Sequence, residues 1–135
     1  MKYITGIHAL NLPCKLLTEG DWHCSSLRWE NITMQDTDDS FFKDYGIEYN
    51  KSIPNHDETY AVANHIRAVL DLLEIGKFQL AHGMNKDFIG NDDYNEEVFS
   101  RVSSMKILPN WSEIDSFMGR EYYSKWLDYK RREHL

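Results

Sequence analysis

The chain has 135 residues, a length that predicts one domain spanning residues 1–135. Its formal net charge is −7, and an acidic balance disfavours nucleic-acid binding because phosphate backbones attract basic surfaces. The sequence carries no apolar run of the roughly 18 to 20 residues that a membrane span needs, and no signal peptide is evident at its start. We therefore expect a cytoplasmic protein.

The cysteines indicate the redox state of the protein, and the distribution of charged residues indicates which kinds of partner it could bind. Cys14 and Cys24 are the two cysteines, and in a chain that can bury a core they indicate reduced thiols rather than a disulfide framework. The basic cluster Lys130–Arg132 is too short and terminal to change the expectation about nucleic acid. Residues 36–58 hold seven carboxylates against two lysines, which fits either a basic protein partner or a surface that simply keeps the protein soluble. The carboxylates are Asp36, Asp38, Asp39, Asp44, Glu48, Asp57 and Glu58.

The first third of the chain predicts β structure. β-Branched and aromatic residues from Lys2 to Leu12 predict a strand with a bulge at Gly6, closed by Pro13 because proline has no N–H to donate to a ladder. One or two further strands are expected between His23 and Met34. The next expected elements are an acidic loop over 35–40, a helical turn over 41–45 and a short strand over 47–49.

Residues 55–76 predict a long central helix around which the rest of the chain packs. Asn55, with Glu58 three residues later, fits a capping box, and Gly76 supplies the left-handed residue that follows a helix. Apolar residues recur at helical spacing along one line of this segment. They are Val62, Ile66, Val69 and Leu73.

A polar stripe occupies the opposite line of the same helix. It consists of Tyr60, Asn64, Arg67, Asp71 and Glu74. Two interpretations stay open: the stripe is the solvated face that an amphipathic helix needs, or, if the helix is enclosed, it lines a pocket or faces a partner. Arg67 and Asp71 form an i,i+4 pair, whereas Asn64 is a poor helix former without a local explanation.

The last third predicts helices. Residues 78–81 are short and apolar and fit either a strand or a helix, and a loop follows between Gly83 and Gly90. A second helix begins near residues 91–94, and the capping-box residues 110–113 open a third. The inner faces are expected to consist of Val98, Phe99, Val102 and Met105 in the second helix and Ile114, Phe117 and Met118 in the third.

Gly119 decides how the third helix ends. An unbroken helix would place Glu121 and Lys125 on its apolar face. We therefore predict a break or bend at Gly119 that leaves these two residues as an exposed i,i+4 pair. A fresh apolar stripe then follows, made of Tyr122, Trp126 and Tyr129.

The order of these elements predicts the fold class. Strands come first and helices afterwards, which is typical of α+β proteins and not of a doubly wound sheet. We expect N-terminal antiparallel strands packed against a long central helix and two or three C-terminal helices.

The densest polar cluster is Asp21-Trp22-His23-Cys24. Asp21 could orient His23 as a general base and Cys24 could act as a nucleophile, but neighbouring residues of an extended segment point to opposite faces. The alternative is a turn aspartate, a half-buried tryptophan and a buried cysteine. The enzymatic hypothesis is a small hydrolase or transferase that uses Asp21 and His23, with Arg67 as an anion clamp.

No pattern assigns a reaction class, a metal or a cofactor. The chain lacks Walker, dinucleotide-binding, nucleophile-elbow, zinc-protease and C-x-x-C motifs. His8, Cys14, His23 and Cys24 match no paired zinc-ligand spacing, and residues 87–93 lack the ligand order of an EF-hand loop. We expect neither metal nor cofactor; whether the chain is an enzyme stays open, with a non-catalytic role favoured.

Several stretches of the chain carry a resemblance to a known family. They are Gly20–His23, Asn64–Asp71, Phe117–Tyr122 and Lys125–Leu127. Together they resemble a family of small uncharacterised bacterial proteins encoded on mobile elements or near toxin–antitoxin-type genes. The resemblance implies a regulatory or neutralising protein with a partner, and it assigns no activity, ligand or catalytic residue.

The leading hypothesis is a non-catalytic protein-interaction or regulatory protein, antitoxin-like in binding a partner protein encoded nearby. It is based on the acidic residues 36–58, the aromatic C-terminal helix and the missing catalytic motifs. The residues expected to bind the partner are Trp22, Tyr60, Asn64, Arg67, Asp71, Tyr122 and Trp126.

Overall fold

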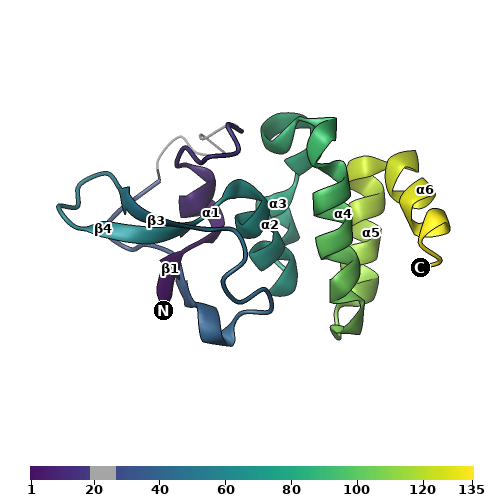
Figure 1. Cartoon of the computed structure of the whole chain (residues 1–135), viewed down its shortest axis with the longest axis horizontal. Helices are drawn as coiled ribbons and strands as arrows, with labels where there is room; N and C mark the ends of the chain where they lie inside the picture. The colour runs from purple at the N-terminus through teal and green to yellow at the C-terminus, as the bar shows by residue number, and fades with distance from the viewer. Residues whose placement is uncertain (19–26) are drawn as a thin grey trace.

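The computed structural model describes residues 1–18 and 27–135 and has the α+β class expected from the sequence. A sheet lies at one end of the molecule and a group of helices at the other, with the N-terminus at the sheet and the C-terminus at the far helical end (Figure 1). Within the described ranges, no helix combines the length and the apolar character that crossing a membrane requires.

The four strands of the sheet have the order β2-β1-β4-β3. β1 pairs antiparallel with β2 and parallel with β4, while β3 and β4 form an antiparallel hairpin that points away from the helices (Figure 1). The parallel pairing of β1 with β4 joins the two antiparallel pairs into a mixed sheet, whereas antiparallel strands alone were expected. The strands are β1 (Lys2–Ile4), β2 (Met34–Asp36), β3 (Ile47–Ser52) and β4 (Thr59–Ala63).

The central helix α2 (His65–Glu74) is shorter than the sequence predicted. Residues 59–63 form β4, which pairs with β1 on one side and β3 on the other, so the prediction of a helix from Asn55 is wrong. Pairing with distant segments outweighs the local helical pattern there. Asn64 is the N-cap: its Oδ1 accepts the Arg67 N–H at 2.9 Å, which supplies the missing explanation for this residue.

The later half of the predicted helix is confirmed. Ile66, Val69 and Leu73 are at most 1% exposed, so α2 is buried in the core. Gly76 follows the helix with a φ of +79°, the left-handed conformation expected of it. α2 lies between the sheet and the C-terminal helices (Figure 1).

The N-terminal strand is also shorter than predicted. β1 ends at Ile4 and a short helix, α1 (Gly6–Leu10), follows, so the prediction of a strand up to Leu12 is wrong. Gly6 has a φ of +62°, which ends the strand and turns the chain rather than forming a bulge within it.

Between the first and third strands, the described residues contain less β structure than expected. Residues 27–33 form no strand, and β2 starts only at Met34; the earlier part of that prediction, from His23 to residue 26, lies outside the described residues. A short 3₁₀-helix, η1 (Thr37–Asp39), and turns then lead to Gly46. The strand predicted at 47–49 is confirmed as β3.

The remaining helices confirm the helical last third, including the helical alternative for residues 78–81 and the predicted inner faces, whose residues are all buried. The predicted loop between Gly83 and Gly90 is instead one turn of π-helix. The elements are α3 (Phe78–Ala81), the π-helix η2 (Met84–Ile89), the 3₁₀-helix η3 (Asp92–Tyr94), α4 (Asn95–Ser103), the 3₁₀-helix η4 (Ser104–Ile107), α5 (Trp111–Tyr122) and α6 (Ser124–Arg132).

The prediction of a break at Gly119 is wrong. α5 runs through Gly119, and the break falls at Tyr123, whose φ and ψ are 54° and −129°. Glu121 is consequently buried, as the spacing of an unbroken helix requires, and its carboxylate accepts the Gly83 N–H at 2.9 Å, which partly compensates the burial of its charge. Lys125 pairs with Asp92 rather than Glu121.

Two glycines provide a matched test of these backbone conformations. Gly46 has a φ of +71°, and a Cβ there would lie 2.8 Å from the Arg67 Cβ, whereas a Cβ at Gly119 would meet nothing within 4 Å. We expect Gly46→Ala to lower the free energy of unfolding by about 2–4 kcal/mol through strain and overpacking. Gly119→Ala should raise it by about 0.5–1 kcal/mol, because alanine favours a helix interior.

Urea unfolding of the two variants beside the wild type measures both effects. Similar stabilities for Gly46→Ala and the wild type would contradict the close contact between residue 46 and α2.

Candidate functional site

The polar face of α2 contains a buried ion pair. Arg67 Nε lies 2.9 Å from Asp71 Oδ1, and the two side chains are 0% and 1% exposed. The i,i+4 spacing on α2 places these two residues on the same face, and the Asn64 cap fixes where the helix starts. A buried ion pair loses its hydration, so its remaining donors and acceptors need partners within the protein.

The Arg67 guanidinium finds those partners in two distant segments. Nη1 donates to the Tyr45 carbonyl oxygen at 2.5 Å, and Nη2 donates to Ser40 Oγ at 2.6 Å. Nη2 also donates to the Tyr3 hydroxyl at 2.9 Å, and the guanidinium lies over the Tyr3 ring. Arg67 therefore joins β1 to the segment between β2 and β3.

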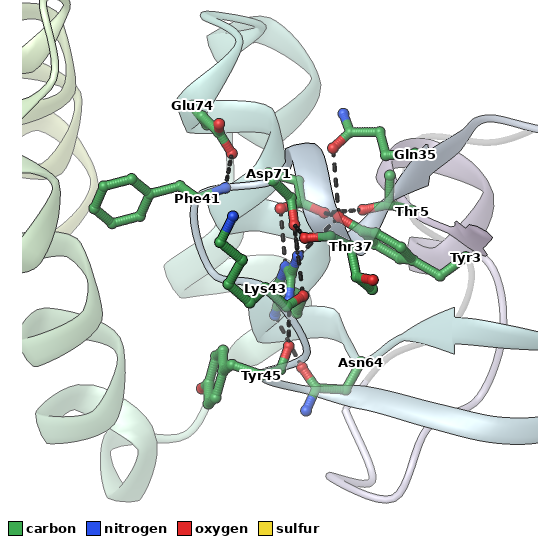
Figure 2. Close-up of polar contacts among 12 residues, drawn as sticks. Tyr3, Thr5, Gln35, Thr37, Phe41, Lys43, Tyr45, Asn64, Asp71 and Glu74 are labelled. Carbon is green, nitrogen blue, oxygen red and sulfur yellow. Dashed lines mark hydrogen bonds and ion pairs between the residues drawn. The ribbon is translucent and has the colours of Figure 1, made fainter. Parts of the chain in front are cut away.

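The second carboxylate oxygen of Asp71 completes the network on the side of β1. Asp71 Oδ2 accepts hydrogen bonds from the Tyr3 hydroxyl at 2.6 Å and from Thr5 Oγ1 at 2.7 Å (Figure 2). Burial, together with the hydrogen bond to the Asp71 carboxylate, raises the pKa of Tyr3 well above its usual value. The tyrosine thus stays protonated and remains a donor to Asp71.

Residues 37–46, which we name the acidic loop, are fixed by the same face of α2. Ser40 and Tyr45 bind Arg67, and the Phe41 N–H donates to Glu74 Oε1 at 3.2 Å (Figure 2). The Asn64 N–H donates to the Gly46 carbonyl oxygen at 2.7 Å. Burial raises the pKa of Glu74, while its hydrogen bond from Phe41 acts in the opposite direction. Four contacts along α2 therefore determine the backbone of the loop.

The other side of the acidic loop contacts α4. The Tyr45 hydroxyl donates to the Glu97 carboxylate, and the Arg101 guanidinium lies 3.8 Å from the centroid of the Tyr45 ring. The loop is consequently held between two helices while its carboxylates face outward. The exposed carboxylates of the acidic loop are Asp38, Asp39 and Asp44.

The fold divides the acidic residues 36–58, which the sequence grouped together. Asp36 binds the N-terminal ammonium at 3.0 Å. Glu48 is 7% exposed, accepts the Lys15 N–H at 2.8 Å and pairs with Lys51 at 3.1 Å. Asp57 is exposed in the connection between β3 and β4, at the end of the hairpin that points away from the helices (Figure 1). Among the described residues of this region, the negative charge that is not paired in this way is concentrated in the acidic loop, on its exposed carboxylates.

The polar stripe predicted on the central helix is therefore an interior feature. Asn64, Arg67, Asp71 and Glu74 contact other segments of the same chain, so the interpretation as a solvated face is wrong for these residues. Tyr60 lies on β4, not on the helix, and its hydroxyl donates to Glu58 at 3.0 Å.

The space beside the ion pair is small. Asp71 lines a cavity of about 30 Å³ between β1, α1 and α2, together with Thr5 and Gly6. That volume holds one or two water molecules. The cavity is too small for a substrate, so the network positions protein groups rather than a ligand.

Two more of the residues expected to bind a partner belong to the core. Tyr122 and Trp126 are 2% and 0% exposed and pack around Phe99, and the Trp126 Nε1–H donates to Asp115 Oδ1 at 2.8 Å. They have almost no surface to offer a partner. Trp22, also expected to bind, lies outside the described residues.

The enzymatic hypothesis places three residues in one cleft. Asp21 and His23 lie outside the described residues, as does Cys24. Arg67 is fully buried and its guanidinium already binds Asp71, Tyr45, Ser40 and Tyr3. It is therefore not exposed to a substrate, as the anion clamp of the enzymatic hypothesis would have to be. Within the described part of the chain, no group of three or more His, Cys, Asp or Glu residues could hold a metal ion.

The basic residues near the C-terminus each have an acidic partner. Lys130 lies 2.8 Å from Asp115 and Arg132 lies 2.8 Å from Glu96. Arg131 contacts Asp128 at 3.4 Å. These pairs neutralise the cluster Lys130–Arg132, which weakens its attraction for phosphate.

Comparison with known proteins adds no relative to this description: no family model, curated protein or solved structure matches the chain. The candidate site therefore depends on the geometry alone. That site is the acidic loop together with the buried network that holds it.

The contribution of the buried ion pair to stability can be tested by replacing Arg67 and then also removing the charge of Asp71. Arg67→Met should lower the free energy of unfolding by about 3–5 kcal/mol, because it leaves the Asp71 carboxylate buried without its cation. Adding Asp71→Asn removes that charge and should restore part of the loss. Urea unfolding of both variants measures the difference.

The exposed pair of Arg131 with Asp128 is the matched control. Arg131→Met should leave the unfolding midpoint unchanged, because surface ion pairs contribute little. If Arg67→Met were as mild as Arg131→Met, the network would not organise the fold.

Proposed function

We propose that this chain is a non-catalytic interaction protein that binds a basic protein partner through the acidic loop. One observation carries the proposal: the fully buried Arg67 uses its guanidinium to hold a backbone carbonyl and a hydroxyl of a charged surface segment. Two hydrogen bonds of the buried network thus fix the conformation of an exposed acidic surface.

A rigid loop is well suited to recognition. A segment that is ordered before binding loses less conformational entropy when a partner docks. The acidic loop is anchored at Ser40, Phe41 and Tyr45, and the exposed carboxylates lie between and beside these anchors. Their positions are therefore fixed relative to α2 in the free protein.

The charge of the loop indicates the chemistry of the partner. Asp38, Asp39 and Asp44 are exposed, and the one lysine among them, Lys43, donates its Nζ–H to the Asp38 carbonyl oxygen at 2.8 Å rather than to a carboxylate. The chain as a whole has a formal net charge of −7. Complementary charges steer association and select the partner, so a basic protein surface fits this loop.

The resemblance noted in the sequence makes the proposal more specific. A protein of the antitoxin type would bind and neutralise a partner encoded nearby, and we place this function in the cytoplasm. The buried free thiol of Cys14 fits a reducing compartment.

The test is affinity capture from the organism of origin with a variant of the loop. Tagged wild-type protein should recover a stoichiometric basic partner that mass spectrometry identifies. The triple variant Asp38→Asn, Asp39→Asn and Asp44→Asn should lose it while keeping the wild-type melting temperature. Rising salt concentration should release the partner from the wild type, because salt screens exposed charges.

A control variant with the same change in charge separates a specific surface from bulk charge. Asp57→Asn, Glu58→Gln and Asp128→Asn remove three exposed carboxylates elsewhere and should leave capture intact. Retention of the partner by the loop variant, its loss from both variants or recovery of chaperones alone would contradict the proposal.

A further inference from the structure

A second polar cluster lies at the start of α2, apart from the acidic loop. It joins Cys14 and Thr18, from the segment after α1, to His65, the first residue of α2. Cys14 Sγ lies 3.6 Å from Thr18 Oγ1, and Thr18 Oγ1 hydrogen-bonds to His65 Nδ1. His65 also hydrogen-bonds to Cys14 through both its side chain and its backbone N–H.

The imidazole of His65 is held in a defined orientation. His65 Nε2 donates to the Leu12 carbonyl oxygen at 2.6 Å, because a carbonyl can only accept. Nδ1 therefore faces Thr18 and Cys14. A thiol, an imidazole within hydrogen-bond reach and a third group that orients the imidazole are the components of an activated cysteine nucleophile.

The environment of Cys14 favours the thiolate. Burial by itself raises the pKa of the thiol, but the hydrogen bonds from His65 and its charge, with a further hydrogen bond from Thr18, outweigh burial and bring the pKa from 9.0 to about 7. The sulfur also lies at the N-terminus of α2, where the helix dipole favours a negative charge.

The other charged groups around Cys14 largely compensate one another. Glu48, from β3, accepts the Lys15 N–H and pairs with Lys51, and Lys51 also donates to the Pro13 carbonyl oxygen. His65 therefore remains the group that sets the charge state of the thiol.

A cleft opens beside the cluster. Thr18 belongs both to the cluster and to the wall of a cleft of about 300 Å³, whose other side consists of Lys86, Asp87 and Gly90 from η2 and its C-cap. Cys14 keeps 8% of its surface exposed. Thr18 thus lies between the Cys14 sulfur and this cleft, which is the approach that we infer for a small molecule.

We propose that Cys14 is a thiolate modification site for small hydroperoxides, with His65 as its positioning residue. The thiolate sulfur attacks one peroxide oxygen, so that an S–O bond forms and the O–O bond breaks. The sulfur is oxidised to a sulfenic acid and the peroxide is reduced. The leaving group, hydroxide from hydrogen peroxide or alkoxide from an organic hydroperoxide, takes a proton from the His65 imidazolium and departs as water or an alcohol. This inference is independent of the proposed function of the acidic loop.

The pH dependence of alkylation tests the thiolate directly. The folded protein carrying Cys24→Ser, in which Cys14 is the remaining cysteine, is treated with iodoacetamide between pH 5 and 10. The rate at Cys14 should follow a titration near pH 7, whereas an ordinary thiol titrates roughly 1.5 to 2 pH units higher. An inflection at or above about pH 8.5, or no alkylation of the folded protein at any pH, would overturn the proposal.

The variant His65→Gln distinguishes an effect of His65 on the titration of Cys14 from a purely structural role of this histidine. Glutamine keeps a donor for Leu12 but carries no imidazolium, so the inflection should move up toward the ordinary value. A merely structural histidine would change the melting temperature and leave the inflection in place, which would count against its role. If His65→Gln fails to fold, the wild-type inflection together with Thr18→Val, which should raise it moderately, decides the question.

The oxidation step has its own readout. Hydrogen peroxide with dimedone at pH 7 should label the Cys14 peptide of the wild type, and the Cys14→Ser variant provides the blank. Labelling of His65→Gln should fall in proportion to its thiolate fraction. Absence of dimedone adduct at Cys14 in the wild type would contradict the proposed modification.

Discussion

The ion pair between Arg67 and Asp71 is the interaction on which the rest of the structure depends. Both side chains are withdrawn from water, and the loss of hydration costs several kcal/mol per ion unless geometry and further hydrogen bonds compensate it. Here the compensation comes from two parts of the chain: Tyr3 and Thr5 around β1, and Ser40 and Tyr45 in the acidic loop. Because each partner satisfies the others, the network is favourable as a whole and unfavourable when any part is missing. It fixes β1 and the acidic loop to one helix face, and the close approach that this demands explains why residue 46 has no side chain.

The sequence predicted the helical half of the fold better than the sheet, for a physical reason. α4 and α5 bury residues spaced three and four apart, so their inner faces follow from local periodicity. β4 does not, because residues 59–63 pair with β1 more than 50 residues away and their spacing also continues the apolar line of α2. The pairing of one strand with a distant strand leaves no pattern in the local sequence from which it could be predicted. The end of α5 was misplaced in a similar way. Keeping Glu121 out of the core required a break at Gly119, but the Gly83 N–H supplies a hydrogen bond that makes the buried carboxylate tolerable.

The candidate site was visible in part. The stripe of Asn64, Arg67, Asp71 and Glu74 followed from helical spacing, but amphipathicity cannot distinguish a face turned to water from a polar face covered by the same chain. The decisive partners, Tyr3 and Ser40, are 64 and 27 residues from Arg67 in the sequence. One local signal did exist. Asn64 is a strong N-cap residue directly before an apolar run, and reading it as a cap would have started the helix at His65 and placed Arg67 in its first turn. His65, by contrast, carries no sequence feature that links it to Cys14, since 51 positions separate them.

A buried ion pair is by itself weak support for stability, because well-packed apolar residues of similar volume commonly stabilise a core equally well. What apolar residues cannot do is bind the carbonyl oxygen of Tyr45 and the hydroxyl of Ser40. Those two bonds determine the course of the acidic loop, whose exposed carboxylates would otherwise repel one another and favour extended, mobile backbone. The guanidinium therefore supplies geometry more than stability, and the geometry that it supplies lies at the surface. A network that served folding alone could end within the core, whereas this one ends on a charged loop, and that is the physical reason for regarding the loop as a recognition surface.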